Sequence, residues 1–249
     1  MVKIRVVGID LGSRTIKLVL LENGTLSNFR IIDTGHDPLS QSKELLSRYE
    51  FDTIVATGYG RHLAKTHFAD TIITEIKAYA LGARHLFPKC RTIIDVGGQD
   101  SKVISIDENG LFQDFEMNDR CAAGTGRFLE VMAKTLDFKI EEFGDQALKA
   151  KRPVNISSTC TVFSESEVIS LIASGEDRKN IALGVHQAIV TRLAAMAGKI
   201  GLKEDIVFAG GVAKNPCISS LLEQKIGMKL FIPKEPQIVG AIGAALTVK

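Results

Sequence analysis

The sequence predicts an α/β protein in which one structural unit occurs twice. The first observation is a repeat: "GIDLGSRTIKLVLLENGTL", which starts at Gly8, is matched by "IIDVGGQDSKVISIDENGLF", which starts at Ile93. Each copy reads as a strand, an Asp-x-Gly turn, a strand, an Asn-Gly turn and a strand, which together make a β-meander. The second observation is that helices and single strands follow each meander. This alternation is typical of sheets that are covered by helices.

The two meanders align residue by residue. The alignment pairs Asp10 with Asp95, Gly12 with Gly97, and Lys17 with Lys102. The second turn of each copy is an Asn-Gly pair, at residues 23–24 and 109–110. We expect these pairs to supply the positive-φ residues that tight hairpin turns favour.

Helices and strands after each meander can be placed in order. In the first half we expect a helix at residues 38–50, a strand at 52–58 and a helix at 74–87. In the second half we expect helices at residues 126–136, 164–175, 176–200 and 215–227, with a strand at 205–211. Ser164 and Glu167 have the spacing of a capping box at the start of their helix, and Gly175 suits its end.

The repeat alone predicts where the chain divides, since no Pro-, Gly- or Ser-rich linker is present. We expect a first domain at residues 1–88 and a second domain at 89–236 that carries the candidate cysteines. The last helix, within residues 237–249, is expected to pack back onto the first domain.

Composition favours small-molecule or protein partners. A chain of 249 residues that is 45% hydrophobic can bury a substantial core. The net charge of +2, with both signs interspersed, gives no basic stripe for nucleic acid. The N-terminal segment has no small-residue cleavage site, and we expect no apolar run of membrane-spanning length. The expected location is the cytoplasm.

Glycine-rich turns suggest a nucleotide site. Two Asp-x-Gly hairpins that face each other could expose backbone N–H groups to phosphates, with Asp10 and Asp95 beside a Mg²⁺ ion and its waters. A third turn, Gly210-Gly211 in "FAGGVAKN", stands between a strand and a helix that begins near Pro216. Each turn could also be a plain hairpin or a plain strand-to-helix connection. Neither a P-loop nor a convincing dinucleotide GxGxxG motif is present.

In their order, the two hairpins, the "FAGGVAKN" turn and the final "GAIGAA" helix resemble the actin, sugar-kinase and Hsp70 ATPase superfamily. Within it, "NDRCAAGTGRFLEVMA" and "STCTVFSESEVISL" resemble the ATP-dependent activators of 2-hydroxyacyl-CoA dehydratases and the ATPase subunits of benzoyl-CoA reductases. The resemblance implies a duplicated ribonuclease H-like fold, with a nucleotide cleft between two domains. It also implies a homodimer with one bridging [4Fe–4S] cluster. Such a protein uses ATP to pass a low-potential electron, received from a ferredoxin or flavodoxin, to a partner acyl-CoA dehydratase or reductase.

The resemblance also implies roles for individual residues. Asp10 and Asp95 would be the catalytic carboxylates. The first phosphate loop would be Gly12, Ser13, Arg14, Thr15, Ile16 and Lys17; the second Gly97, Gly98 and Gln99; and the adenosine turn Gly210 and Gly211, with Pro216 and Gln237 as further nucleotide contacts.

Two of the four cysteines stand in a distinctive setting. Cys121 and Cys160 each come just before a predicted helix, where the positive end of the helix dipole favours a thiolate. A [4Fe–4S] cluster takes four thiolates, so two chains would supply them. Gly124 and Gly126 would let backbone N–H groups or a close neighbour approach Cys121. Cys90 and Cys217 are expected to be packing residues.

Two other functions remain open on the sequence alone. A small-molecule kinase of the same superfamily would use an aspartate as base for a substrate hydroxyl, but extra sequence for a sugar site is missing. A non-catalytic regulatory module would keep the glycine turns without needing the paired cysteines. The identity of the partner, its acyl-CoA substrate and the cluster potential are not encoded in these motifs.

Overall fold

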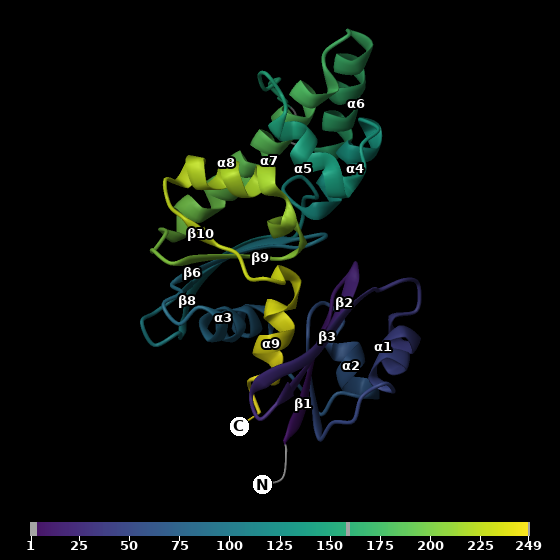
Figure 1. Ribbon diagram of the computed structural model, residues 1–249, viewed down its shortest axis with the longest axis vertical. Coiled ribbons are helices and arrows are strands. Elements are labelled where there is room, and N and C mark those ends of the chain that lie inside the picture. The colour runs from purple at the N-terminus through teal and green to yellow at the C-terminus, as the bar shows by residue number, and fades with distance from the viewer. Residues whose placement is uncertain (1–3, 158–159, 249) are drawn as a thin grey trace.

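A computed structural model of the chain describes residues 4–157 and 160–248. Within these residues, two five-stranded sheets are covered by helices on both faces (Figure 1). The strand orders are β3-β2-β1-β4-β5 and, read from the matching edge, β8-β7-β6-β9-β10. Because the two orders are equivalent, the predicted α/β class and the predicted duplication are confirmed.

The bounds of the elements follow the chain. The strands are β1 (Arg5–Leu11), β2 (Thr15–Glu22), β3 (Thr25–Asp33), β4 (Thr53–Thr57), β5 (Thr71–Ile72), β6 (Thr92–Val96), β7 (Ser101–Ile106), β8 (Phe112–Asn118), β9 (Ile206–Ala209) and β10 (Leu230–Phe231). The helices are α1 (Pro38–Leu46), α2 (Arg61–His67), α3 (Glu75–Leu86), α4 (Gly126–Thr135), α5 (Ile140–Leu148), α6 (Thr161–Ala173), α7 (Arg178–Ile200), α8 (Pro216–Ile226) and α9 (Val239–Ala245), with short 3₁₀ turns η1 (Gly211–Lys214) and η2 (Pro236–Ile238).

The first sheet has two apolar faces. Alternate residues of β1 point to opposite sides, so that Val7 packs with α1 and α2 while Val6 packs with α9. Burial on both faces explains why β1 and much of β2 and β4 are apolar, whereas the edge strand β3 is largely exposed.

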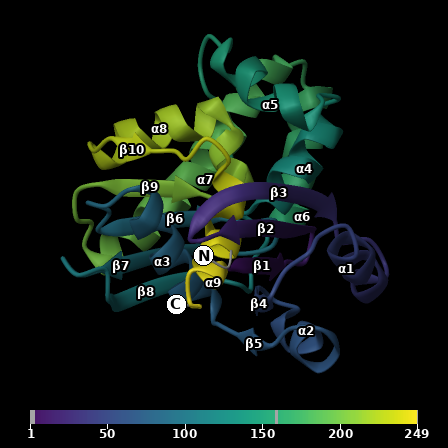
Figure 2. The ribbon, with the colours of Figure 1, turned by 60° about the horizontal axis from the view of Figure 1, so that its bottom comes forward.

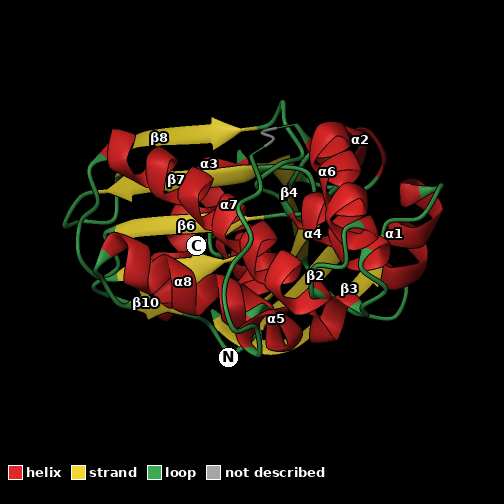
Figure 3. Ribbon diagram, turned by 90° about the horizontal axis from the view of Figure 1, so that it is seen from above, coloured by secondary structure: helices red, strands yellow, loops and turns green. Residues whose placement is uncertain are grey.

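The second sheet is covered by α7 and α8 on one face and by α3 on the other. Figure 3, seen from above, shows α7 crossing strands β6 to β8 and α8 lying beside it on the side of β9 and β10. On the opposite face, Tyr79 and Ala83 of α3 pack against Ile93 and Ile104. Helix α3 therefore lies on the second sheet although it precedes residue 88, and the domain boundary at that residue stays a prediction.

Helices α3 and α9 lie side by side, as Figures 1 and 2 show. Their backbones touch at two glycines: a Cβ at Gly82 would overlap the Val239 carbonyl, and one at Gly243 would overlap the Ala78 carbonyl. Since α9 packs on the first sheet and α3 on the second, this contact joins the two halves of the molecule.

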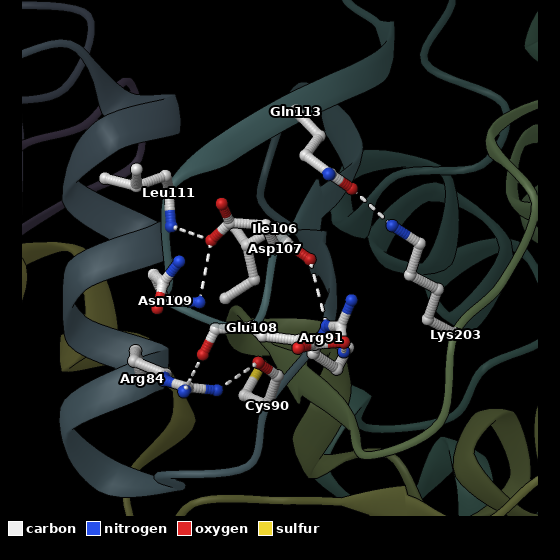
Figure 4. A network of polar contacts seen from close by, with 10 residues as sticks. All are labelled: Arg84, Cys90, Arg91, Ile106, Asp107, Glu108, Asn109, Leu111, Gln113 and Lys203. Atoms are coloured by element: carbon white, nitrogen blue, oxygen red, sulfur yellow. Dashed lines mark hydrogen bonds and ion pairs between the residues drawn. The ribbon is translucent and has the colours of Figure 1, made fainter.

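A polar network ties α3 to the loop between β7 and β8 (Figure 4). Arg84 of α3 donates to the carbonyl oxygens of Cys90 and Glu108. Asp107 accepts hydrogen bonds from the backbone N–H groups of Asn109 and Leu111. Because the aspartate closes this longer loop, Gly110 has a positive φ of 80° but Asn109 does not, contrary to the prediction for the second Asn-Gly turn.

Helix α6 also differs from its prediction. It begins at Thr161 rather than near Ser164, because the Ser164 N–H bonds to the Cys160 carbonyl inside the first turn. Glu167 does not complete a capping box there; it accepts hydrogen bonds from the backbone and hydroxyl of Ser157. Gly175 does follow the helix with a φ of 84°, as expected.

By length and composition, α7 could cross a membrane, which corrects the expectation that no segment reaches that length. The helix has 23 residues, and 56% of its most apolar stretch is buried inside the protein. Val185, Ile189 and Leu193 belong to the core beside the second sheet. Its apolar character is thus used in packing.

Candidate functional site

Two equivalent aspartate–lysine pairs face a common cleft. In each meander the aspartate stands near the end of the first strand and the lysine opposite it on the second strand. Lys17 Nζ lies 3.1 Å from Asp10 Oδ2, and Lys102 Nζ lies 3.5 Å from Asp95 Oδ2. Both aspartates line one small cavity of about 60 Å³. The repeat seen in the sequence therefore brings its two conspicuous carboxylates to one place.

A glycine stands against each carboxylate. Gly58, after β4, has a φ of 91°, and a Cβ there would overlap Asp10 Oδ1. Gly210, after β9, has a φ of 84°, and a Cβ there would lie 2.6 Å from Asp95 Oδ1. Only glycine accepts both the left-handed backbone and this close approach. Sequence reasoning identified Gly210 but missed Gly58, although "VATGYG" and "VFAGGV" occupy equivalent places.

The second pair is buried in a charged cluster. Burial raises the pKa of Asp95 to about 6, against the opposing attraction of Lys102. Burial alone would lower the pKa of Lys102, but the carboxylates of Asp95, Glu75 and Asp100 outweigh it and raise that pKa above its ordinary value. Lys102 is only 3% exposed, and its Nζ lies 2.9 Å from Glu75 and 2.7 Å from Asp100.

Tyr79 lies between the two pairs. Its side chain is buried and lines the cleft, and burial together with the charges of Asp95 and Asp10 raises its pKa well above the ordinary value. Its phenol therefore stays protonated and can only donate or accept hydrogen bonds at neutral pH. Because Tyr79 comes from α3, no motif in either meander pointed to it.

A larger cavity of about 520 Å³ continues from the aspartates between the two halves of the molecule. It is lined by both hairpin turns, by the glycine turn after β9 and by parts of α4, α5 and α8. The lining residues include Arg14, Thr15, Lys17, Gly97, Gly98, Gly210, Gly211, Pro216 and Gln237, all of which the sequence predicted. Its volume lies in the range of small-molecule sites.

Most of the predicted site residues thus come together, with two exceptions. Gly12 and Ser13 line the smaller cavity. Ile16 is fully buried in the core of the first sheet, so only its backbone could meet a ligand. Gln99 is exposed at the second turn and is not among the residues that line either cavity.

Helix α5, which sequence reasoning missed, forms one wall of the larger cavity through Ile140, Glu141 and Gly144. A Cβ at Gly144 would overlap the side chain of Asn215, so this glycine lets α5 approach α8 closely. Asn215 caps α8 by accepting hydrogen bonds from the N–H groups of Cys217 and Ile218.

A buried histidine holds that cap in place. His186 of α7 donates from Nδ1 to the Ala182 carbonyl at 2.7 Å, so its Nε2 accepts from Asn215 Nδ2 at 3.0 Å. Burial lowers the pKa of His186 to about 4, which keeps the ring neutral and able to accept. Helix α7 is thereby attached to the wall of the cavity.

The four cysteines fall into two classes. Cys90 and Cys217 are fully buried, and burial raises the pKa of each thiol to about 12, as expected for packing residues. Cys121 is half-buried in the loop before α4, and Cys160 is exposed at the start of α6. Within the described part of the chain, no three or more Cys, His, Asp or Glu side chains are grouped to hold a metal ion.

The Cys121 segment is attached directly to the second hairpin turn. At the start of α4, the N–H of Gly126 donates to Gly97 O and that of Arg127 to Gly98 O, each at 2.9 Å. These first N–H groups of α4 therefore donate to the carbonyl oxygens of the second hairpin turn and not to the Cys121 sulfur. This modifies the expectation from the sequence that the start of this helix acts on the thiolate. Two backbone hydrogen bonds thus connect the second hairpin turn to the segment that carries Cys121.

Comparison with known proteins identifies relatives along almost the whole chain. Residues 7–248 match the BadF/BadG/BcrA/BcrD ATPase family. The chain is 40% identical to the 2-hydroxyisocaproyl-CoA dehydratase activator of Clostridioides difficile, over 96% of this chain and 92% of that protein. It is 40% identical to the (R)-2-hydroxyglutaryl-CoA dehydratase activating ATPase of Acidaminococcus fermentans, over 96% and 95%. It is 29% identical to one of the subunits of benzoyl-CoA reductase from Thauera aromatica, over 96% and 91%.

The solved structures of both activators share the fold. The activator from Clostridium difficile, which holds bound ADPNP, superposes with a TM-score of 0.90 over 98% of this chain and 94% of that one, at 39% identity. Component A of the Acidaminococcus fermentans dehydratase superposes with a TM-score of 0.91 over 98% and 97%, at 38% identity. The two-domain actin-like fold implied by the resemblance is therefore confirmed.

Proposed function

The chain belongs to the BadF/BadG/BcrA/BcrD ATPase family, and from this membership we propose that it uses ATP to activate a partner enzyme by electron transfer. The partner would be a dehydratase or reductase with an acyl-CoA substrate, since the relatives are dehydratase activators and a component of benzoyl-CoA reductase. One observation carries the proposal. The twin aspartate–lysine pairs meet at a cleft whose second turn is hydrogen-bonded to the Cys121 segment.

The nucleotide would lie along the cleft with its phosphates at the hairpin turns. The larger cavity offers Gly210, Gly211 and Pro216 for the nucleoside, and the smaller one offers the turns of both meanders for the phosphates. Lys17 and Lys102 would balance part of the phosphate charge. Bound ADPNP in the similar Clostridium difficile protein supports this choice of ligand.

The charges at the aspartates fit a hydrated divalent cation. Four carboxylates and three cations line the small cavity, which leaves one excess negative charge; they are Asp10, Glu75, Asp95 and Asp100 with Arg14, Lys17 and Lys102. In residues 4–157 and 160–248, Asp95 Oδ1 is buried without a hydrogen-bond partner. Mg²⁺, when bound with the nucleotide, would neutralise phosphate charge there. Asp10 and Asp95 would hold its waters, because the described side chains do not form a complete ligand set.

Asp95 would also act as the base for hydrolysis. Its pKa of about 6 is close to neutrality, so the carboxylate is available at pH 7 yet can accept a proton from an attacking water. Asp10 would orient this water from the first hairpin. Tyr79 would exclude other water from the space between them.

The cysteines fit one half of a [4Fe–4S] site. Cys121 and Cys160 are the accessible thiols, and within the described residues the Cys160 side chain makes no capping hydrogen bond. Two copies of the chain would supply four thiolates, so the protein would act as a homodimer. The bound cluster would supply a one-electron carrier of low potential, and the donor would be a ferredoxin or flavodoxin.

Anaerobic purification tests the proposal. We expect a brown dimer with about four iron and four sulfide per two chains whose ATPase activity is measurable by phosphate release. Reduced protein and ATP should together switch on a purified 2-hydroxyacyl-CoA dehydratase. A colourless protein that does not hydrolyse ATP would favour a regulatory module instead, and ADP release that depends on an added alcohol would favour a kinase.

A further inference from the structure

A guanidinium group contacts the sulfur of Cys121. Arg192, in the middle of α7, donates from Nη1 to Cys121 Sγ over 3.5 Å. The contact joins residues 71 positions apart in the chain, and none of the motifs in the sequence pointed to it.

Gly124 leaves the space through which the Arg192 side chain reaches the sulfur. Gly124 has a φ of 102°, and a Cβ at this position would lie 2.8 Å from Arg192 Cδ. Gly124 thus permits a neighbour to approach Cys121, as the sequence suggested, and the neighbour is the side chain of Arg192. Any larger residue would have to displace the arginine from the sulfur.

The cysteine loop is also held by Asn118. Its Nδ2 donates to Cys121 O at 2.8 Å, and its Oδ1 accepts from Cys121 N at 3.3 Å. Because both backbone groups of Cys121 are engaged, the sulfur has a defined position relative to α7. The Arg192 contact is therefore part of a built arrangement.

Arg192 also faces the segment that leads to the second cysteine. It lines an open groove of about 480 Å³ together with Asn155, Ile156 and Ser157. One arginine therefore touches the first cysteine and borders the approach to the second.

Resting on the proposed function, we propose that Arg192 is a positioning residue that orients the Cys121 sulfur toward the cluster and raises the reduction potential of the cluster. The physical reason is electrostatic. Reduction adds one negative charge to the cluster, and a cation with an N–H bond to a ligating sulfur stabilises that charge. The reduced state is thereby made accessible to the electron donor.

Arg192→Gln tests this role through the midpoint potential, measured by anaerobic redox titration of the loaded dimer. We expect the reduced state to lose about tenfold in relative stability, which for one electron lowers the potential by about 59 mV. The electron paramagnetic resonance spectrum of the reduced protein should change as well. Arg192→Lys keeps the charge and should recover most of the potential.

Lys199→Gln is the matched control. It removes one positive charge from the same helix, but Lys199 is 66% exposed and pairs with Glu116. We expect its potential to equal that of the wild type. Equal potentials and spectra in Arg192→Gln and Lys199→Gln would overturn the inference while the proposed function stands. A wild-type dimer without iron would overturn both.

Discussion

Arg14 and Glu130 form an ion pair that joins the first hairpin turn to α4. Arg14 Nη2 donates to both carboxylate oxygens, at 3.0 and 3.1 Å. The arginine side chain is 51% exposed and that of the glutamate 31%, so the pair is accessible and only weakly stabilising. Both residues line the larger cavity, where a phosphate would compete with Glu130 for the guanidinium.

Glu130→Gln should therefore tighten nucleotide binding. Freed from its carboxylate partner, Arg14 is available to the phosphates, and we expect the Kd for ADP to fall by up to about fivefold, the equivalent of about 1 kcal/mol. Arg14→Gln should weaken binding. Isothermal titration calorimetry at low salt measures both. Arg127→Gln is the control: it removes the second partner of Glu130, whose carboxylate lies 3.1 Å from the Arg127 guanidinium, and it should leave the Kd unchanged. A change in Kd as large as that in Glu130→Gln would show that the net charge of α4, and not the Arg14–Glu130 ion pair, controls binding.

The cysteines should divide into two pairs. Cys121→Ala and Cys160→Ala should each abolish the cluster, because each removes two of the four thiolates of a dimer. Cys90→Ala and Cys217→Ala should retain it, since both thiols are enclosed in the core. Iron and sulfide analysis with visible absorption decides the matter, and full iron content in either of the first two variants would refute shared ligation.

Removing the charge of either aspartate should impair ATP turnover. Asp10→Asn and Asp95→Asn keep the shape of the side chain but lose the carboxylate at the cleft, so we expect kcat to fall at least about a hundredfold. Cluster content should stay normal. In the wild type, kcat/KM, which reports the nucleotide-free protein, should rise with pH around 6, where Asp95 loses its proton. Wild-type rates in both variants would contradict the assignment.

Asp95 should lower the stability of the nucleotide-free protein at neutral pH. Its pKa is about 6 in the folded chain against an ordinary 3.8. As pH rises between these values, the unfolded chain releases the proton while the folded chain retains it, so the free energy of unfolding falls. Asp95→Asn removes this loss and should stabilise the protein by about 1–3 kcal/mol at pH 7.

Urea unfolding at pH 7 and near pH 4 measures this effect. The stabilisation by Asp95→Asn should largely disappear near pH 4, because the unfolded chain retains the proton on much of Asp95 there. Asp145→Asn is the control, because Asp145 is exposed on α5. A stabilisation that is independent of pH would point to packing instead of charge.

The glycine beside Asp95 should tolerate no side chain. Gly210→Ala combines a left-handed backbone with overlap of the new Cβ on Asp95 and Val96, and should cost about 3 kcal/mol or more. Gly227→Ala has a similar φ of 68° but no atom within 4 Å of the new Cβ, and should cost only about 1 kcal/mol. The Gly210 backbone, with ψ of 173°, is also nearly confined to glycine, whereas Gly227, with ψ of 20°, is an ordinary left-handed cap. Denaturant midpoints therefore measure the backbone and the overlap together, and equal losses would mean that neither costs more at Gly210 than at Gly227.

The sequence predicted best those site residues that lie in neighbouring segments of the chain. The repeat predicted Asp10, Asp95 and the strands that carry them, because a meander is built from neighbouring segments. The partners that complete the site come from distant elements: Tyr79 from α3, Gly144 from α5 and Arg192 from α7. Their positions depend on how helices pack over the sheets, which periodicity does not reveal. Lys102 could have been identified as a site residue, since it aligns with Lys17 in the repeat.

Helix α3 precedes the second sheet in the chain and packs on it, whereas α9 follows the second sheet and packs on the first. This arrangement affects how the chain folds while it is being synthesised. The helix that covers Val6, Val19 and Val55 of the first sheet leaves the ribosome only after all strands of both sheets have been made. Until residues 239–245 emerge, one face of that sheet has no cover, although its strands were made first. The N-terminal half therefore cannot complete its fold before these residues are made, and until then the nascent chain presents an apolar surface of the kind that chaperones bind.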